Sequence, residues 1–173
     1  DCGYEKLDGT LELKNSFEAM KNCTETKLGK KIDKVLCIPI EIGGANSLSP
    51  LMFAGENGYE VVDADFMGRA YPTLNYITPV FYNQQIFPIV FANDYGDSNI
   101  ISEEEVLMSD SNKVYNWDKV NAKTFEIIEP WSYVAGVSLY PYTKDQIKNF
   151  SVKYTLSRAR NLGEAIFTSK VLK

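Results

Sequence analysis

The segment 35–50, VLCIPIEIGGANSLSP, constrains the fold of this chain more strongly than any other stretch. Residues 35–40 form a short apolar run rich in β-branched side chains, which is the pattern of a buried strand. Gly43 and Gly44 follow this run, and glycine accepts positive φ and lets a ligand approach the backbone closely. The segment therefore predicts a strand that leads directly into a glycine turn.

A helix and a second strand are expected after the glycine turn. Ser49 before Pro50 suits a helix N-cap with proline at the first helical position. Residues 51–57 then carry the helix, Gly58 suits its left-handed end, and residues 61–62 make a second strand. A strand–helix–strand unit of this length is a crossover, so we expect the two strands to be parallel.

Acidic residues stand where the two strands end. Glu41 follows the first strand, and Asp63 and Asp65 follow the second. Because ligands of open α/β sheets bind at the carboxyl ends of the strands, we expect these carboxylates and the glycine turn to share one crevice. We predict an α/β fold with a Rossmann-like βαβ unit of parallel strands, followed by an α+β section that contains a β-hairpin.

The regions around this unit favour other elements. Residues 10–28 have apolar side chains at helical spacing and predict an amphipathic helix. Residues 74–82 and 86–93 are rich in β-forming residues. A turn at 94–98 leads from them into a strand at 99–102, so this middle section predicts a β-meander.

The last third of the chain predicts mainly helices. They are expected at 116–128, 143–150 and 155–167, with a strand at 132–140. The change of pattern after the βαβ unit divides the chain into two portions. We assign residues 1–78 to an α/β portion that carries the glycine turn and the acidic motif. Residues 79–173 form an α+β portion with the meander and the C-terminal helices.

Composition excludes several function classes. The 173 residues, 45% of them hydrophobic, can form one large domain or two small ones with a real core. A net charge of -5 without a basic stripe argues against nucleic-acid binding, and no apolar run is long enough for a membrane span. Three scattered cysteines favour a reducing compartment, so we expect a cytoplasmic protein. Without histidine, a Ser-His-Asp triad and a Cys-His pair are excluded within this chain.

The glycine turn and its neighbours are candidates for substrate binding. Gly43 and Gly44 before a helix present backbone N–H groups that favour an anion or a polarised carbonyl oxygen. The alternative is a tight turn without a ligand. Asn46 either donates to a substrate carbonyl or caps the turn, and Ser47 of the same motif is a further binding candidate. The segment lacks GxGxxG spacing and a Walker lysine, which argues against a nucleotide.

The catalytic candidates are Glu41, Asp63, Asp65 and Arg69. One aspartate can act as a general base on a water while the other orients it. Alternatively, each aspartate caps a helix or closes a loop. The two aspartates and Glu41 could also hold a hard divalent cation, although the sequence names no cofactor. Arg69 either clamps Asp65 or contacts an imide-like substrate.

These motifs resemble the hallmark segments of the S-methyl thiohydantoin desulfurase family in order and spacing. The segments are EIGGANS at 41–47, VVDAD at 61–65 and MGRAYP at 67–72. Tyr4–Leu7 resembles the family segment that precedes them, and residues 138–141 resemble the start of its second domain. The resemblance implies a hydrolase-like enzyme that acts on a small cyclic amide, a hydantoin or an S-methyl thiohydantoin.

Members of that family are longer than this chain, so the chain resembles an internal portion of a two-domain protein. The alternative function is a non-catalytic subunit or binding module that partners a hydantoinase- or oxoprolinase-type enzyme. The aromatic-rich middle has more apolar surface than a hairpin alone can cover. We therefore expect a homo-oligomer, or further chain segments, to cover an apolar patch along Tyr76, Val80, Phe81 and Phe87.

Overall fold

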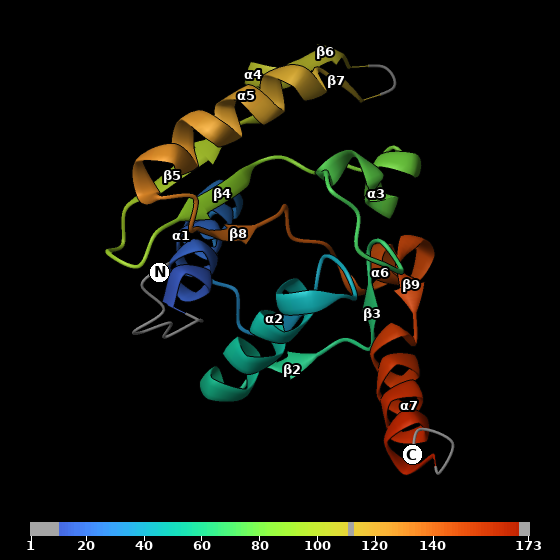
Figure 1. Ribbon diagram of the computed structural model, residues 1–173. Helices are drawn as coiled ribbons and strands as arrows, with labels where there is room; N and C mark the ends of the chain where they lie inside the picture. Colours follow the sequence, from blue (N-terminus) through green and yellow to red (C-terminus); the bar gives the residue numbers. More distant parts are fainter. Residues whose placement is uncertain (1–10, 111–112, 170–173) are drawn as a thin grey trace.

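The computed structural model describes residues 11–110 and 113–169, and its fold is mixed α/β (Figure 1). At the centre lies an antiparallel sheet with the strand order β5-β4-β8. Its strands are Ile89–Ala92 (β4), Ser98–Ile101 (β5) and Gly136–Ser138 (β8). Strands β4 and β5 flank the turn predicted at 94–98, so the β-hairpin is confirmed.

Both faces of this sheet are covered. Every residue of β4 is buried, and successive strand residues point to opposite faces. Helix α1, Leu11–Leu28, contacts β4 and β8, and Figure 1 shows helix α5, Trp117–Ile128, on the side away from α1. A β-carbon at Gly136 would lie 2.1 Å from the carbonyl oxygen of Glu12, so glycine is what allows α1 to approach β8 so closely.

The predicted βαβ unit is present in a short form. Strand β1, Leu36–Cys37, pairs in parallel with β2, Glu60–Val61, and helix α2, Gly44–Asn57, connects them. The expected parallel pairing is therefore confirmed. No Rossmann-like sheet forms, because the other strand pairings in the described part of the chain are antiparallel. Pro39 has no N–H with which to extend β1 over the predicted range.

Helix α2 begins earlier than the sequence predicts. Its N-cap is Gly43, and Pro50 lies inside the helix, so the prediction of an N-cap at Ser49 is wrong. The backbone at Gly43, with φ 155°, already turns the chain into the helix. The predicted end is confirmed, because Gly58 closes α2 in the left-handed conformation with φ 71°.

A second antiparallel pair joins distant parts of the chain. Strand β3, Ala64–Asp65, pairs with β9, Val152–Lys153. Helix α6, Lys144–Phe150, precedes β9 and helix α7, Thr155–Thr168, follows it, so both predicted helices are confirmed. The pair crosses the boundary between the two portions of the chain, whose division at residue 78 stays a prediction.

The β structure predicted over 74–82 is wrong. This stretch forms a short 3₁₀ helix, Leu74–Tyr76 (η1), and helix α3, Thr78–Phe81. Pro79 lies in the first turn of α3, where its missing N–H has no helical partner to lose. The remaining elements are Glu103–Val106 (α4), Leu107–Ser109 (β6), Val114–Tyr115 (β7) and Glu129–Trp131 (η2). The strand predicted at 132–140 is shortened to β8.

The predicted apolar patch is present only in part. Tyr76 and Phe81 are exposed, whereas Val80 is half-buried. Phe87 is fully buried and its ring lies 4.8 Å from that of Tyr115, so its predicted exposure is wrong.

None of the helices among the described residues combines the length and the apolar character that crossing a bilayer requires. The motif Tyr4–Leu7 lies outside the described residues.

Candidate functional site

Glu41 joins two of the predicted motifs at the start of α2. Glu41 is buried, with only 6% of its surface exposed. Oε1 accepts a hydrogen bond of 2.8 Å from the Asn46 side-chain amide. Oε2 accepts one of 3.1 Å from the backbone N–H of Tyr71. The segment 41–47 and the segment 67–72 therefore lie side by side.

Close backbone packing reinforces this contact. A β-carbon at Gly43 would lie 3.1 Å from the β-carbon of Ala70, and Gly44 has a left-handed φ of 56°. The backbone N–H of Phe66 also donates to the carbonyl of Ile40 at 3.0 Å. A side chain at Gly43 would press on Ala70, and at Gly44 the left-handed backbone itself favours glycine.

The first turn of α2 has donors without a side-chain cap. No side chain caps the helix at Gly43, and Ala45 and Asn46 are exposed. Helix N-termini present backbone N–H groups and positive partial charge, which favour an anion or a polarised carbonyl oxygen. Ser47 does not join this group, because it is buried and its hydroxyl donates to the carbonyl of Gly44 at 2.9 Å.

Asp65 is fully buried beside this turn. Its Oδ1 accepts hydrogen bonds from the backbone N–H groups of Met67, at 2.6 Å, and Gly68, at 2.5 Å. Its Oδ2 has no hydrogen-bond partner among the described residues. Asp65 thus shapes the loop that carries the third motif, and one carboxylate oxygen remains uncommitted.

Asp63 faces a different partner. Its carboxylate accepts from the backbone N–H of Ser157 at 3.0 Å and from the Ser157 hydroxyl at 2.5 Å. These two bonds, the hydroxyl first, lower the pKa of Asp63 from its usual value. Asp63 therefore caps α7, and the structure does not bring it together with Asp65. The described residues contain no group of three acidic or cysteine side chains that could hold a metal ion.

Arg69 is not a clamp for Asp65. Its side chain is exposed, and its guanidinium lies 5.6 Å from the centre of the Tyr71 ring. The Tyr71 ring in turn stacks on Tyr76, with centroids 5.2 Å apart and an angle of 26° between the rings. The sequence reasoning missed both tyrosines. The available indication of a contact between arginine and an aromatic ring was the spacing of Arg69 and Tyr71, two residues apart in the segment RAYP.

The comparisons with known proteins now bear on this geometry. Residues 1–103 match the family described as S-Me-THD-like, N-terminal domain. This chain belongs to the S-Me-THD-like family. The resemblance to the S-methyl thiohydantoin desulfurase family is thereby confirmed, and the match contains all three motifs, two of which meet at Glu41.

A crystal structure of a protein from Chromobacterium violaceum has a similar fold. It was solved by the Northeast Structural Genomics Consortium, and it is 25% identical in sequence with a TM-score of 0.74. The similarity covers 91% of this chain and 41% of that protein's chain, so this family member spans less than half of the solved relative. No curated protein matches the chain.

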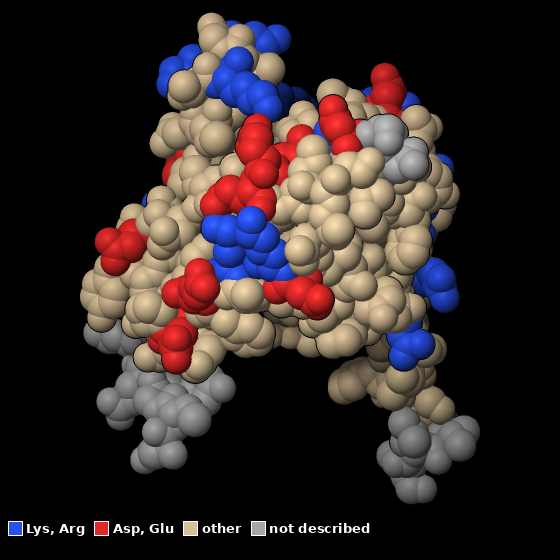
Figure 2. All heavy atoms as spheres, turned by 90° about the horizontal axis from the view of Figure 1, so that it is seen from above, with Lys and Arg blue, Asp and Glu red and all other residues tan. Residues whose placement is uncertain are grey.

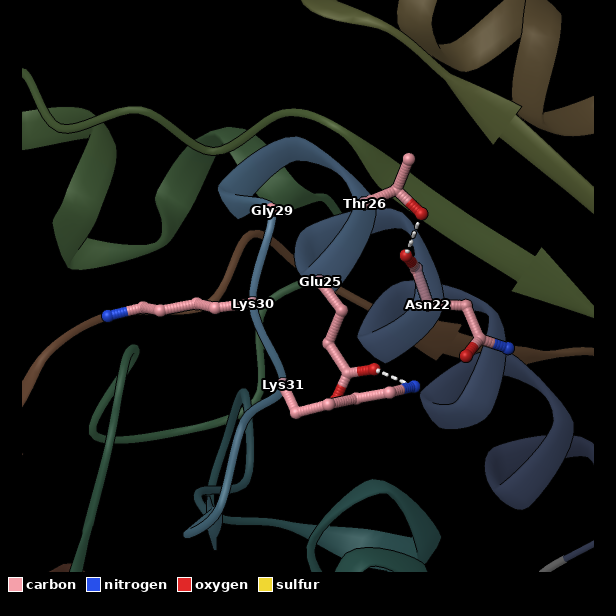
Figure 3. Close-up of a pocket in the computed structure, with 6 residues that line it drawn as sticks. All are labelled: Asn22, Glu25, Thr26, Gly29, Lys30 and Lys31. Atoms are coloured by element: carbon pink, nitrogen blue, oxygen red, sulfur yellow. Dashed lines mark hydrogen bonds and ion pairs between the residues drawn. The ribbon is translucent and has the colours of Figure 1, made fainter.

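Two surface hollows lie away from the motifs. One, of about 450 Å³, surrounds the end of α1, and Figure 3 shows Glu25 and Lys31 meeting in it. The Glu25 carboxylate accepts from Lys31 Nζ at 2.8 Å and from the N–H of Ile32 at 2.9 Å, so its charge is already matched. The other, of about 300 Å³, lies between the turn at 93–97 and η2. Neither hollow contains a motif residue.

Charges are mixed on the face above the sheet. Figure 2 shows acidic and basic side chains interleaved there, without a continuous basic area. Two of the ion pairs are Lys113–Glu103 at 3.1 Å and Lys123–Glu105 at 2.5 Å. An alternation of this kind gives little attraction for a phosphate backbone.

Proposed function

We propose that this S-Me-THD-like chain provides the binding end of a hydrolase-like site for a small cyclic amide, a hydantoin or an S-methyl thiohydantoin. The observation that carries the proposal is the hydrogen bond from Asn46 to the buried carboxylate of Glu41. It fixes one N–H of the Asn46 amide. The exposed side chain keeps its second N–H and its carbonyl oxygen for a ligand.

The free edge of Asn46 is complementary to such a substrate. A cyclic amide presents an N–H and a C=O side by side, and a primary amide can pair with both. The uncapped N–H groups at the start of α2 would stabilise negative charge that develops on the substrate oxygen or nitrogen. For an S-methyl thiohydantoin, water adds at the carbon that bears sulfur, methanethiol leaves with a proton, and a hydantoin remains.

The carboxylates supply the base in this proposal. Glu41 lies beside Asn46, and Asp65 has one oxygen without a partner among the described residues. Either can take a proton from the attacking water.

Cys23 and Cys37 are free thiols, and burial raises the pKa of Cys37. Free cysteines support a reducing, cytoplasmic setting for the activity.

Turnover of the protein in its full length tests this function. Release of methanethiol from an S-methyl thiohydantoin and ring opening of hydantoin are measured for Glu41→Gln and Asp65→Asn. We expect each variant to lose about 100-fold in kcat/KM. Asp63→Asn is the matched control, because Asp63 caps α7 instead of facing the turn. Unchanged turnover in both site variants would remove these carboxylates from the mechanism.

The exposed face of α7 favours a second candidate. Leu162, Ile166 and Phe167 are 63%, 52% and 92% exposed on this helix. A non-catalytic module that docks on a hydantoinase- or oxoprolinase-type enzyme, or on a second copy, would cover them. Turnover that is absent from the isolated protein and appears only with a co-purified partner would select this candidate.

A further inference from the structure

We propose that Arg69, Tyr71 and Tyr76 form a specificity surface that selects planar ring substrates bearing a carboxylate. The inference rests on the function proposed above and names the substrate class for that site. It concerns residues outside the Glu41 and Asp65 carboxylates.

The position of this specificity surface is fixed by the site itself. The backbone N–H of Tyr71 donates to Glu41 Oε2 at 3.1 Å, and the neighbouring Ala70 packs against Gly43. Glu41 and Gly43, which contact the loop 67–72, are therefore also the residues that precede the start of α2. Asn46 and the backbone of Tyr71 thus bond the two oxygens of one carboxylate, which brings the segment of the specificity surface close to Asn46.

The two tyrosines provide a flat aromatic surface. Their rings stack at 5.2 Å, yet Tyr71 remains 40% exposed and Tyr76 44% exposed. Tyrosine rings are enriched at interfaces, because each has a large apolar face and a polar hydroxyl. A planar amide or imide ring can stack on this surface and bury the remaining apolar area.

Arg69 adds a charge that no acid among the described residues offsets. No carboxylate of the described residues forms an ion pair with it. Its contact is instead with the Tyr71 ring, 5.6 Å from the guanidinium. A guanidinium can stack on an aromatic ring and still present its fork of N–H donors to a carboxylate. An acid group on a ring that lies over the tyrosines would meet this fork.

The equilibrium affinities of two ring compounds, measured under conditions in which neither is consumed, test the proposal separately from turnover. Hydantoin and hydantoin-5-acetic acid share the ring and differ in the carboxylate. For Arg69→Gln, calorimetry should show affinity for the acid falling about tenfold or more, and affinity for hydantoin falling less than about twofold. Tyr76→Ala should weaken both probes alike, whereas Tyr76→Phe should keep both. Lys153→Gln, which removes another exposed cation, is the control and should change neither.

The outcomes separate this inference from the proposed function. Equal losses for both probes in Arg69→Gln, no loss for either, or no binding of the acid to the unchanged protein would each overturn the specificity surface. The function is judged instead by turnover in Glu41→Gln and Asp65→Asn. Melting temperatures of Arg69→Gln, Tyr76→Ala and Lys153→Gln within about 2 °C of the unchanged protein verify that these exposed substitutions leave the fold intact.

Discussion

The sheet β5-β4-β8 and the unit β1-α2-β2 are stabilised by different interactions. In the sheet, β4 is wholly buried and α1 packs directly on Gly136. In the βαβ unit the strands are two residues long, and Leu36 of β1 is 41% exposed. Phe53 and Ala54 of α2 are buried, and the Phe53 ring packs against Phe17 and Tyr59. The turn before α2 and the loop after β3 are instead held by hydrogen bonds to the carboxylates of Glu41 and Asp65. Apolar burial thus dominates in the sheet, whereas polar bonds shape the segments that carry the motifs.

This difference predicts opposite responses to the same substitution. Gly136→Ala places a methyl group 2.1 Å from the backbone of α1, so α1 must move off the sheet. We expect a loss of roughly 3 kcal/mol in the free energy of unfolding. Gly55→Ala, in α2, meets nothing within 4 Å and should stabilise by about 0.5–1 kcal/mol. Urea denaturation measures both, and similar small effects would contradict the close packing at Gly136.

Removing a charge should be costly in the βαβ unit. In Glu41→Gln the new amide group faces a donor, either Asn46 Nδ2 or the N–H of Tyr71. One buried donor then lacks a partner, and we expect a loss of about 1–3 kcal/mol. Glu60→Gln is the control in the same unit, since Glu60 is exposed and paired only with Lys34. Equal midpoints of denaturation for the two variants would show that the Glu41 bonds do not stabilise this unit.

Asp63→Ala should release α7 from the βαβ unit. The variant loses both bonds to Ser157, which act as a helix cap worth about 1 kcal/mol. Hydrogen exchange in the first turn of α7 should accelerate, whereas exchange in β4 should not change relative to global stability. Ser157→Ala, which keeps the backbone bond, should have a smaller effect.

The sign of the pH dependence of this cap follows from the lowered pKa of Asp63. The ionised form makes the stabilising bonds, so the contribution is complete above the unfolded-state pKa of about 3.9. It is lost as the pH falls through the lower folded-state pKa. The difference between Asp63→Ala and the unchanged protein should therefore shrink in acid, and a constant difference down to about pH 2 would contradict this assignment.

The smallest effect is expected at an ion pair beside the sheet. The bond from Lys123 and then the N–H of Ser102 lower the pKa of Glu105 to about 2. Both side chains are partly exposed, so we expect Glu105→Gln to cost less than about 1 kcal/mol at neutral pH. The cost should disappear between about pH 4.5 and pH 2, and about 1 M salt should reduce it. A larger, salt-independent effect would mean that polar bonds also govern the sheet region.

Local patterns predicted the parts of this fold that local interactions determine. The parallel pair, the left-handed end at Gly58 and the hairpin were each encoded in neighbouring residues. The β propensity of 74–82 was overridden, because Pro79 suits the first turn of α3. The β3-β9 pair was not predicted, since two-residue strands leave no periodic pattern.

The candidate site was predictable to the same extent. Strand order predicted a shared position for Glu41, Asp63, Asp65 and the glycine turn, but it did not predict the bond from Tyr71 to Glu41 that joins segments 41–47 and 67–72. The role of Asp63 as a cap for α7 could not be read from the sequence, because its partner Ser157 is 94 residues away. The stacking of Tyr71 on Tyr76 depends on the conformation of η1, which the sequence did not indicate.

The distance along the chain between Asp63 and Ser157 also sets an order of events during synthesis. The two residues are 94 positions apart, so β3 has no partner strand until β9 has been translated. At roughly 5–20 residues per second, this interval lasts on the order of 10 s. For that time the nascent chain carries β3, which includes the buried Asp65, without its partner strand.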